Sequence, residues 1–166
     1  MILGANAILA AMEAGEIVIE PFDMANLKAA SVDLTLGREF VIRRLGNRTE
    51  LSVPHLALQP DARILGHTVE RVAIGPGIVA RVEGKSTWGR KFLAVHMTAG
   101  FVDPGWDGQL TLEMANFSGS TIDIDFGAPI CQISFERVEL VPGPIVDATY
   151  RGMGGRYTGK SVEGPK

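Results

Sequence analysis

Cysteine is almost absent from the 166-residue sequence, and this excludes several classes of protein. The one cysteine, Cys131, has no partner for an internal disulfide, and a zinc site built from cysteines needs more of them. It lies in the apolar run 129–135, so we expect a buried thiol. The sequence also lacks an HExxH motif, a Cys/His cluster and a GxSxG elbow. A zinc protease, a zinc-dependent nucleobase deaminase and an α/β-hydrolase are therefore unsupported.

An excess of positive charge and a long apolar run are also missing. The net charge is -3 at pH 7, so nucleic acid is not expected as a main partner, although a few local cations could bind a small anion. No apolar run approaches the ~20 residues of a membrane span, and Glu13 and Glu16 lie early without a basic stretch before them. We expect no membrane span, no secretory signal and a cytoplasmic location.

Short apolar runs separated by glycine and proline turns make up most of the sequence. The alanine-rich segment 5–13 predicts one short helix. Turn signals that recur every ~8–12 residues favour a mostly β barrel or sandwich, and the length favours one domain over 1–166. Strand patterns cover 17–19, 31–37, 39–44, 68–74, 77–82, 92–97, 109–116, 121–126 and 130–140, whereas 56–66 is predicted irregular and 118–120 a hairpin turn.

The stretch 81–116 has the most unusual composition. Its turn 84–87, Gly-Lys-Ser-Thr, resembles the end of a Walker A loop, but the full motif needs a glycine where Val79 stands, so a P-loop is rejected. A glycine turn with two hydroxyls and a cation, followed by Arg90, still suits a polyphosphate. A solvated turn is an equally good interpretation of 84–87.

One acid lies inside a predicted strand of this stretch. Glu113 shares a strand face with Thr111, while the apolar side chains 110, 112 and 114 share the other. If the face of Glu113 is solvent, the residue is an ordinary surface acid; if the face lines a pocket, the carboxyl could transfer protons. His96 lies in an apolar strand pattern, where a core or interface role is favoured over catalysis.

The last residues, from about 142 to 166, differ from the rest because glycine and proline prevent them from building a core. One interpretation is a disordered tail. The other is a mobile arm, in which glycine amides and cations such as Arg156 and Lys160 surround phosphates while Tyr150 covers a base or sugar.

Together these motifs resemble the dCTP deaminase branch of the dUTPase superfamily. The family pattern EGRSS…R, then H-x-TA, IDPG[WF]xG and LE, matches residues 83–113 in order and spacing. The SVDLTLG segment at 31–37 also fits. This resemblance implies a distorted, mostly antiparallel β barrel of the dUTPase-like type with one short N-terminal helix and a flexible C-terminal arm. It also implies a homotrimer with active sites between subunits.

The resemblance implies a role for individual residues. Glu113 matches the catalytic acid/base that activates water for attack on C4 of cytosine, Ser86 matches the serine that places this water, and Arg90 matches a supporting arginine. Asp103 matches the aspartate that activates water in dUTPases. Lys85 stands in place of the usual arginine, so it keeps the charge and loses the bidentate fork. The residues matched to substrate binding are Lys85, Thr87, Ala99, Trp106, Thr111, Tyr150, Arg156 and Lys160.

The resemblance leaves several activities open. The Gly100-Phe101 pair after Ala99 is similar to the bifunctional members, which convert dCTP to dUMP and pyrophosphate. The alternatives are a deaminase that stops at dUTP, a plain dUTP diphosphatase that uses Asp103, and a catalytically silent nucleotide-binding protein. Glu113 argues against the plain diphosphatase, because trimeric dUTPases carry an apolar residue at its position. Magnesium is expected on the substrate triphosphate, with no metal ligand from the protein and no zinc.

Overall fold

The computed structural model describes residues 1–44 and 47–139 of the chain. The predicted C-terminal arm, about 142–166, lies outside these residues, and so do Tyr150, Arg156 and Lys160. The elements are α1 (Ala5–Glu13), β1 (Ile17–Glu20), a 3-10 turn (Met24–Asn26), β2 (Val32–Thr35), β3 (Glu39–Arg44), β4 (Asn47–Ser52), β5 (His55–Leu58), β6 (Arg63–Ile74), β7 (Ile78–Gly84), α2 (Ser86–Gly89), β8 (Leu93–Ala94), β9 (Phe101–Val102), β10 (Asp107–Asn116), β11 (Ile122–Asp125) and β12 (Pro129–Arg137).

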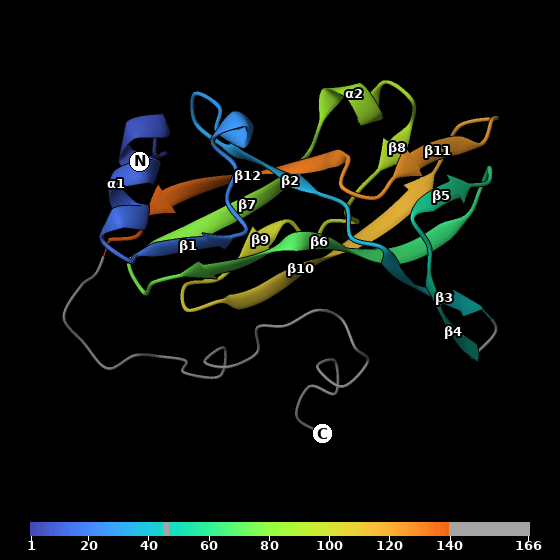
Figure 1. The fold of residues 1–166 in the computed structure, drawn as a ribbon, viewed down its shortest axis with the longest axis horizontal. Helices are drawn as coiled ribbons and strands as arrows, with labels where there is room; N and C mark the ends of the chain where they lie inside the picture. Colours follow the sequence, from blue (N-terminus) through green and yellow to red (C-terminus); the bar gives the residue numbers. More distant parts are fainter. Residues whose placement is uncertain (45–46, 140–166) are drawn as a thin grey trace.

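Antiparallel sheets build the described part of the chain, with α1 at one end (Figure 1). The largest sheet has the strand order β4-β3-β6-β10-β8, and β1 adds a further pairing to β6. A second sheet has the order β2-β12-β7-β9, and β5 pairs with β11 in a small two-stranded sheet. The prediction of a mostly β antiparallel fold with a short N-terminal helix over 5–13 is confirmed.

The buried apolar side chains form one cluster that draws on both larger sheets and on the inner face of α1. Ile8 of α1, Leu112 of β10 and Phe135 of β12 are each fully buried in it. Cys131 is also fully buried, and this burial raises the pKa of its thiol. The prediction of a buried thiol is therefore confirmed.

Several local predictions are wrong, and long-range pairing explains most of them. The segment predicted to be irregular, 56–66, contains most of β5 and the start of β6, because these strands find partners in β11 and β10. The strand predicted over 92–97 is limited to the two residues of β8, and Phe92 before it has a positive φ of 60°. The turn predicted at 84–87 gives way to the short helix α2.

The prediction of a hairpin turn at 118–120 is also wrong, because β11 pairs with β5 and not with the preceding β10. The buried side chain of Asn116 directs the chain here. Its amide donates to the carbonyl oxygens of Leu58 and Ser120, each at 2.8 Å, and its carbonyl accepts from the backbone N–H of Ser118 at 2.8 Å. These bonds tie the segment after β10 to the end of β5, next to which β11 then pairs.

The β5–β11 sheet carries a histidine between two carboxylates, and this predicts a pH dependence. The His55 ring nitrogens lie 2.8 Å from Asp125 Oδ1 and 3.1 Å from Asp123 Oδ1. Hydrogen bonding to Asp125, and then to Asp123, raises the pKa of His55 above its ordinary value of 6.5. The interaction thus stabilises the folded chain fully below pH 6.5 and is lost as the pH rises through the raised value.

We expect an NMR titration of the His55 ring to give a pKa above 6.5, and Asp125→Asn to move it back toward that value. The control is the same titration of the chain in denaturant, where the carboxylates no longer hold the ring. A folded-state pKa equal to the denatured one would contradict this expectation.

Candidate active site

The helix α2 presents Ser86 and Arg90 together. Backbone bonds from Gly89 N–H to Lys85 O and from Arg90 N–H to Ser86 O, each 3.0 Å, form its turn. Residues four apart lie on one helix face, and Arg90 Nη1 lies 3.5 Å from Ser86 Oγ. Trp88 fixes the helix to the second sheet, because its indole N–H donates to Pro129 O at 2.8 Å. The exposed hydroxyl and guanidinium are therefore held by a rigid support.

Lys85, which directly precedes α2, does not point freely into solvent. Its ammonium forms an ion pair and hydrogen bond with Oδ2 of Asp33, whose side chain is 5% exposed. Lys28 Nζ lies 3.5 Å from the same oxygen. Asp33 alternates with the apolar Val32 and Leu34 along β2, yet it is buried as they are.

The sequence analysis did not single out Asp33 or Lys28, which the structure brings together with Lys85. An acid inside an apolar strand is the signal that singled out Glu113, and the same signal was present at Asp33. No sequence pattern singled out Lys28, because only the structure shows that its ammonium contacts the Asp33 carboxylate. Thr87, also predicted to bind phosphate, is exposed on α2 beside this cluster.

Glu113 lies in β10 and is half-buried, together with Thr111 on the same face of the strand. Its carboxylate Oε2 accepts the backbone N–H of Met97 at 3.2 Å. Among residues 1–44 and 47–139, this neutral donor is the one hydrogen-bond partner of the Glu113 carboxylate, and it binds one of the two oxygens. Glu113 is thus neither fully exposed nor a lining residue of a cavity among the described residues.

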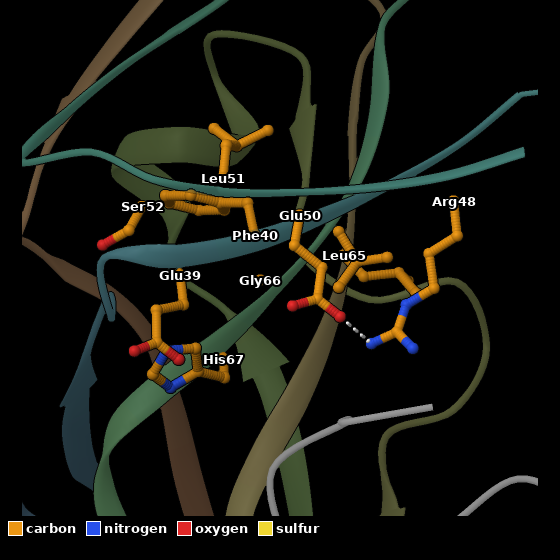
Figure 2. Close-up of a pocket in the computed structure, with 10 residues that line it drawn as sticks. Glu39, Phe40, Arg48, Glu50, Leu51, Ser52, Leu65, Gly66 and His67 are labelled. Carbon is orange, nitrogen blue, oxygen red and sulfur yellow. Dashed lines mark ion pairs between the residues drawn. The ribbon is translucent and has the colours of Figure 1, made fainter. Parts of the chain in front are cut away.

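A cavity of about 490 Å³ lies in the same sheet (Figure 2). Residues 65–67 of β6 form part of it, and Phe40 of β3 and Leu51 of β4 line it as well. Arg48 and Glu50 of β4 form a 2.6 Å ion pair at the cavity, drawn as a dashed line in Figure 2.

The strand register places the predicted residues of β10 opposite two residues of β6 that line this cavity. In the β6–β10 ladder, Thr111 lies opposite His67 and Glu113 lies opposite Leu65. Directly opposed residues of antiparallel strands share a sheet face, with their Cβ atoms about 5 Å apart. The residues that line the cavity come from β3, β4 and β6, so Thr111 and Glu113 lie on the neighbouring strand of the sheet and are not part of its lining.

The segment before β10 is held close to β7. Gly100 O accepts the N–H of Val82 at 2.7 Å, and a Cβ atom on Gly100 would lie only 2.6 Å from Val82 O. No side chain fits at this position, which is a physical reason for glycine after the exposed Ala99.

His96 precedes this segment and is predicted to lie in the core or an interface. Its side chain is partly buried, and its Nε2 lies 3.9 Å from Glu83 Oε2.

Asp103 and Trp106 occupy the turn between β9 and β10. Trp106 N–H donates to Asp103 O at 3.2 Å, and Gly105 at the third position has a φ of 86°, as a type II turn requires. Ile74 of β6 holds the turn, since its carbonyl accepts from Gly105 N and its N–H donates to Trp106 O, each at 3.0 Å. The Trp106 ring is half-buried and packs on the core.

The predicted site residues therefore form two groups on one chain. The first is cationic and consists of Lys85, Ser86, Thr87 and Arg90 around α2; the second is the β10 face with Thr111 and Glu113. Within residues 1–44 and 47–139, no hydrogen bond or ion pair joins Glu113 to α2. The same part of the chain holds no group of three or more His, Cys, Asp or Glu arranged for a metal ion, and no helix that could span a membrane.

Comparisons with known proteins agree on one family. A family model described as dCTP deaminase-like matches residues 2–138. A protein of Coprothermobacter proteolyticus named "dCTP deaminase, dUMP-forming" is 35% identical over 100% of this chain and 94% of the relative. A protein of Natronomonas pharaonis named "dCTP deaminase" is 36% identical over 84% of this chain and 82% of the relative.

Solved structures share the fold at lower identity. The 2'-deoxycytidine 5'-triphosphate deaminase from Agrobacterium tumefaciens superposes with a TM-score of 0.68 at 22% identity, over 83% of this chain and 48% of that chain, so this chain spans about half its length. A mutant dUTPase from phage phi11 of S. aureus gives a TM-score of 0.54 at 14% identity, over 79% of this chain and 96% of that chain. On this evidence the chain has a dUTPase-like fold and belongs to the dCTP deaminase-like family.

Proposed function

We propose that this protein deaminates dCTP hydrolytically and carries the product on to dUMP and pyrophosphate. The observation that carries the proposal is the placement of Glu113, a half-buried acid in a strand whose carboxylate accepts the backbone N–H of Met97. The family match and the names of the relatives support dCTP as substrate. Alternatives are a deaminase that stops at dUTP and a plain dUTP diphosphatase.

The proposed deamination uses Glu113 first as base and then as acid. Its free carboxylate oxygen takes a proton from water while the water oxygen bonds to C4 of cytosine. The protonated carboxyl passes this proton to N3, because the C4–N3 double bond opens as the water oxygen adds. Glu113 then takes the proton of the C4 hydroxyl and delivers it to the exocyclic amine, so that the C4–N bond breaks, ammonia leaves and a C4 carbonyl remains. Met97 N–H fixes the carboxylate during these transfers. Ser86 and the backbone at Ala99 would place the water, and Arg90 would support Ser86.

We further propose that the two groups of site residues meet between subunits of a homotrimer. The cationic group at α2 and the acid on β10 are not in contact within the described chain. Met97 and Phe101, which lie close in sequence to the site segment, expose 50% and 53% of their surface, as residues at a subunit contact would. Thr111, Trp106 and the arm residues Tyr150, Arg156 and Lys160 would complete the nucleotide contacts, the arm lying outside the described residues.

A magnesium ion would be carried by the triphosphate of the substrate. The described residues include ammonium and guanidinium groups at α2 but no cluster of carboxylates or imidazoles for a metal, so their chemistry suits phosphate oxygens rather than a cation. When bound, magnesium would neutralise phosphate charge during cleavage of the phosphate chain.

The dUMP-forming activity is supported by Gly100 and Asp103. The tight contact with Val82 O admits only glycine at position 100, which is the form found in the bifunctional proteins that this sequence resembles. Asp103 lies in a turn held by β6, and its carboxylate is proposed to activate the water that attacks the triphosphate. The relatives themselves divide between the two names.

The proposal is tested by incubating the full chain with dCTP and magnesium, with a parallel sample of dUTP, and separating the products by chromatography. We expect ammonia and dUMP from dCTP, and dUMP from dUTP. Products that stop at dUTP would leave deamination standing and refute the second step. Turnover of dUTP alone would refute deamination and assign the chain as a dUTP diphosphatase.

Glu113→Gln is expected to lower the kcat for ammonia release at least about 100-fold, because the amide cannot take a proton from water. Binding of dCTP should change little, since the amide oxygen can still accept the Met97 N–H. The matched control is Glu13→Gln, the same change at an exposed site on α1. Ammonia release above a tenth of the normal rate would remove Glu113 from the proton transfer.

Asp103→Asn is expected to separate the two proposed steps. Ammonia release from dCTP should continue, while dUMP formation falls at least about 100-fold and dUTP accumulates. The substitution keeps the turn, because the turn uses the backbone carbonyl of residue 103 and not its side chain. Unchanged dUMP formation would mean that Asp103 does not activate the second water.

A further inference from the structure

Lys28 is a cation that the family motifs do not include, yet the fold brings it to the proposed phosphate site. It lies between the 3-10 turn and β2, far in sequence from α2. Its Nζ donates to Ala25 O at 2.8 Å and lies 3.5 Å from Asp33 Oδ2. That oxygen is the one that also binds the ammonium of Lys85. Two ammonium groups from distant parts of the chain therefore meet at a single carboxylate oxygen.

The charges in this cluster do not balance. Lys28 and Lys85 contribute two positive charges against the one carboxylate of Asp33, and Arg90 adds a third at the other end of α2. Asp33 is 5% exposed, and its Oδ1 is buried with no hydrogen-bond partner among residues 1–44 and 47–139. The carboxylate is thus a buried anchor, while the excess positive charge faces outward.

Both ammonium groups keep the capacity to bind an anion. An ammonium has three donors, and Lys28 uses at most two of them on Ala25 O and Asp33. The side chains of Lys28 and Lys85 remain 45% and 22% exposed, so a ligand can reach them. Holding a long lysine side chain in place costs rotamer entropy, and a carboxylate that already binds Lys85 does not need a second cation.

We infer that Lys28 is a further binding residue for the phosphate chain of the nucleotide, and that Asp33 is a positioning residue that holds Lys28 and Lys85 beside each other. The inference rests on the proposed function for the identity of the ligand as a nucleoside triphosphate. Two ammonium groups on one anchor offer two separate donors to phosphate oxygens, where the related proteins use one arginine fork. Lys28 thus supplies the second contact that a lysine at position 85 cannot make alone.

The test measures binding of inorganic tripolyphosphate to the full chain by calorimetry, together with KM and kcat for dCTP. Lys28→Gln is expected to raise the Kd for tripolyphosphate and the KM for dCTP about tenfold each, with kcat unchanged, because one charge-assisted contact is lost. The matched control is Lys91→Gln. Lys91 follows α2 and carries the same charge, but its ammonium lies over the Trp88 ring at 4.8 Å. We expect its Kd and KM to stay within about twofold of the unchanged chain, because no phosphate contact is proposed for Lys91 and a twofold change is less than about 0.5 kcal/mol.

The positioning role of Asp33 is tested by a double-variant cycle. In the Asp33→Asn chain, the further change Lys28→Gln should alter the Kd less than about twofold, because Lys28 is no longer held at the site. Lys28→Arg should keep most of the affinity, which a purely structural role would not require. An equal effect of Lys28→Gln with and without Asp33 would refute the positioning role.

The outcomes separate this inference from the proposed function. Equal Kd values for Lys28→Gln and Lys91→Gln, or no binding of tripolyphosphate to the unchanged chain, would overturn the inference even if dCTP is deaminated. A chain that releases no ammonia from dCTP, yet loses tripolyphosphate affinity only in Lys28→Gln, would refute the deaminase and leave the phosphate contact standing.

Discussion

The long strand β6 is the constraint on which the arrangement of the described chain depends. It pairs with β1, β3 and β10, so that three separate segments take their register from it. Its pairing with β10 places Glu113 opposite Leu65, and its last residue, Ile74, holds the turn that carries Asp103. A shift of one residue in this register would turn Glu113 toward the apolar core, where an unpaired carboxyl is strongly unfavourable. The sheet that stabilises the fold therefore also fixes Glu113 on the half-buried face of β10.

Asp33 and Glu113 are both carboxylates inside strands, but their different partners give them different roles. Asp33 is buried and bound by ammonium groups, so its charge is neutralised where it stands and serves to hold cations. Glu113 is only half-buried and receives one neutral backbone donor, so it keeps an oxygen that can accept a proton. The partners, more than the residue type, distinguish an anchor from a proton-transfer group under the proposed mechanism.

Sequence patterns correctly predicted the elements that depend on neighbouring residues. They failed for the elements that depend on pairing with a distant segment. The helix α1 and the strand β3 follow from composition and pattern, and the structure has them at the predicted bounds. The strand β5 and the placement of β11 depend on each other across more than sixty residues, and the short helix α2 depends on Trp88 reaching Pro129. Local patterns also pointed to Glu113, as an acid in an apolar strand, and to Arg90, as the cation that follows the turn 84–87. No sequence pattern around Lys28 indicates a role, because its contact with the Asp33 carboxylate on another element is visible only in the structure.

The separation of the cationic group from Glu113 within one chain has a chemical consequence. An ammonium or guanidinium beside Glu113 would form an ion pair with it, and an ion-paired carboxylate is a poor acceptor for the proton of water. Within the described residues, Lys28 and Lys85 are bound to Asp33 and Arg90 lies beside Ser86, while the hydrogen-bond partner of Glu113 is a backbone N–H. If a second subunit brings its α2 toward Glu113, the phosphate charges of the substrate arrive with it and occupy the cations. A site divided between subunits would thus keep the base free until the nucleotide is bound.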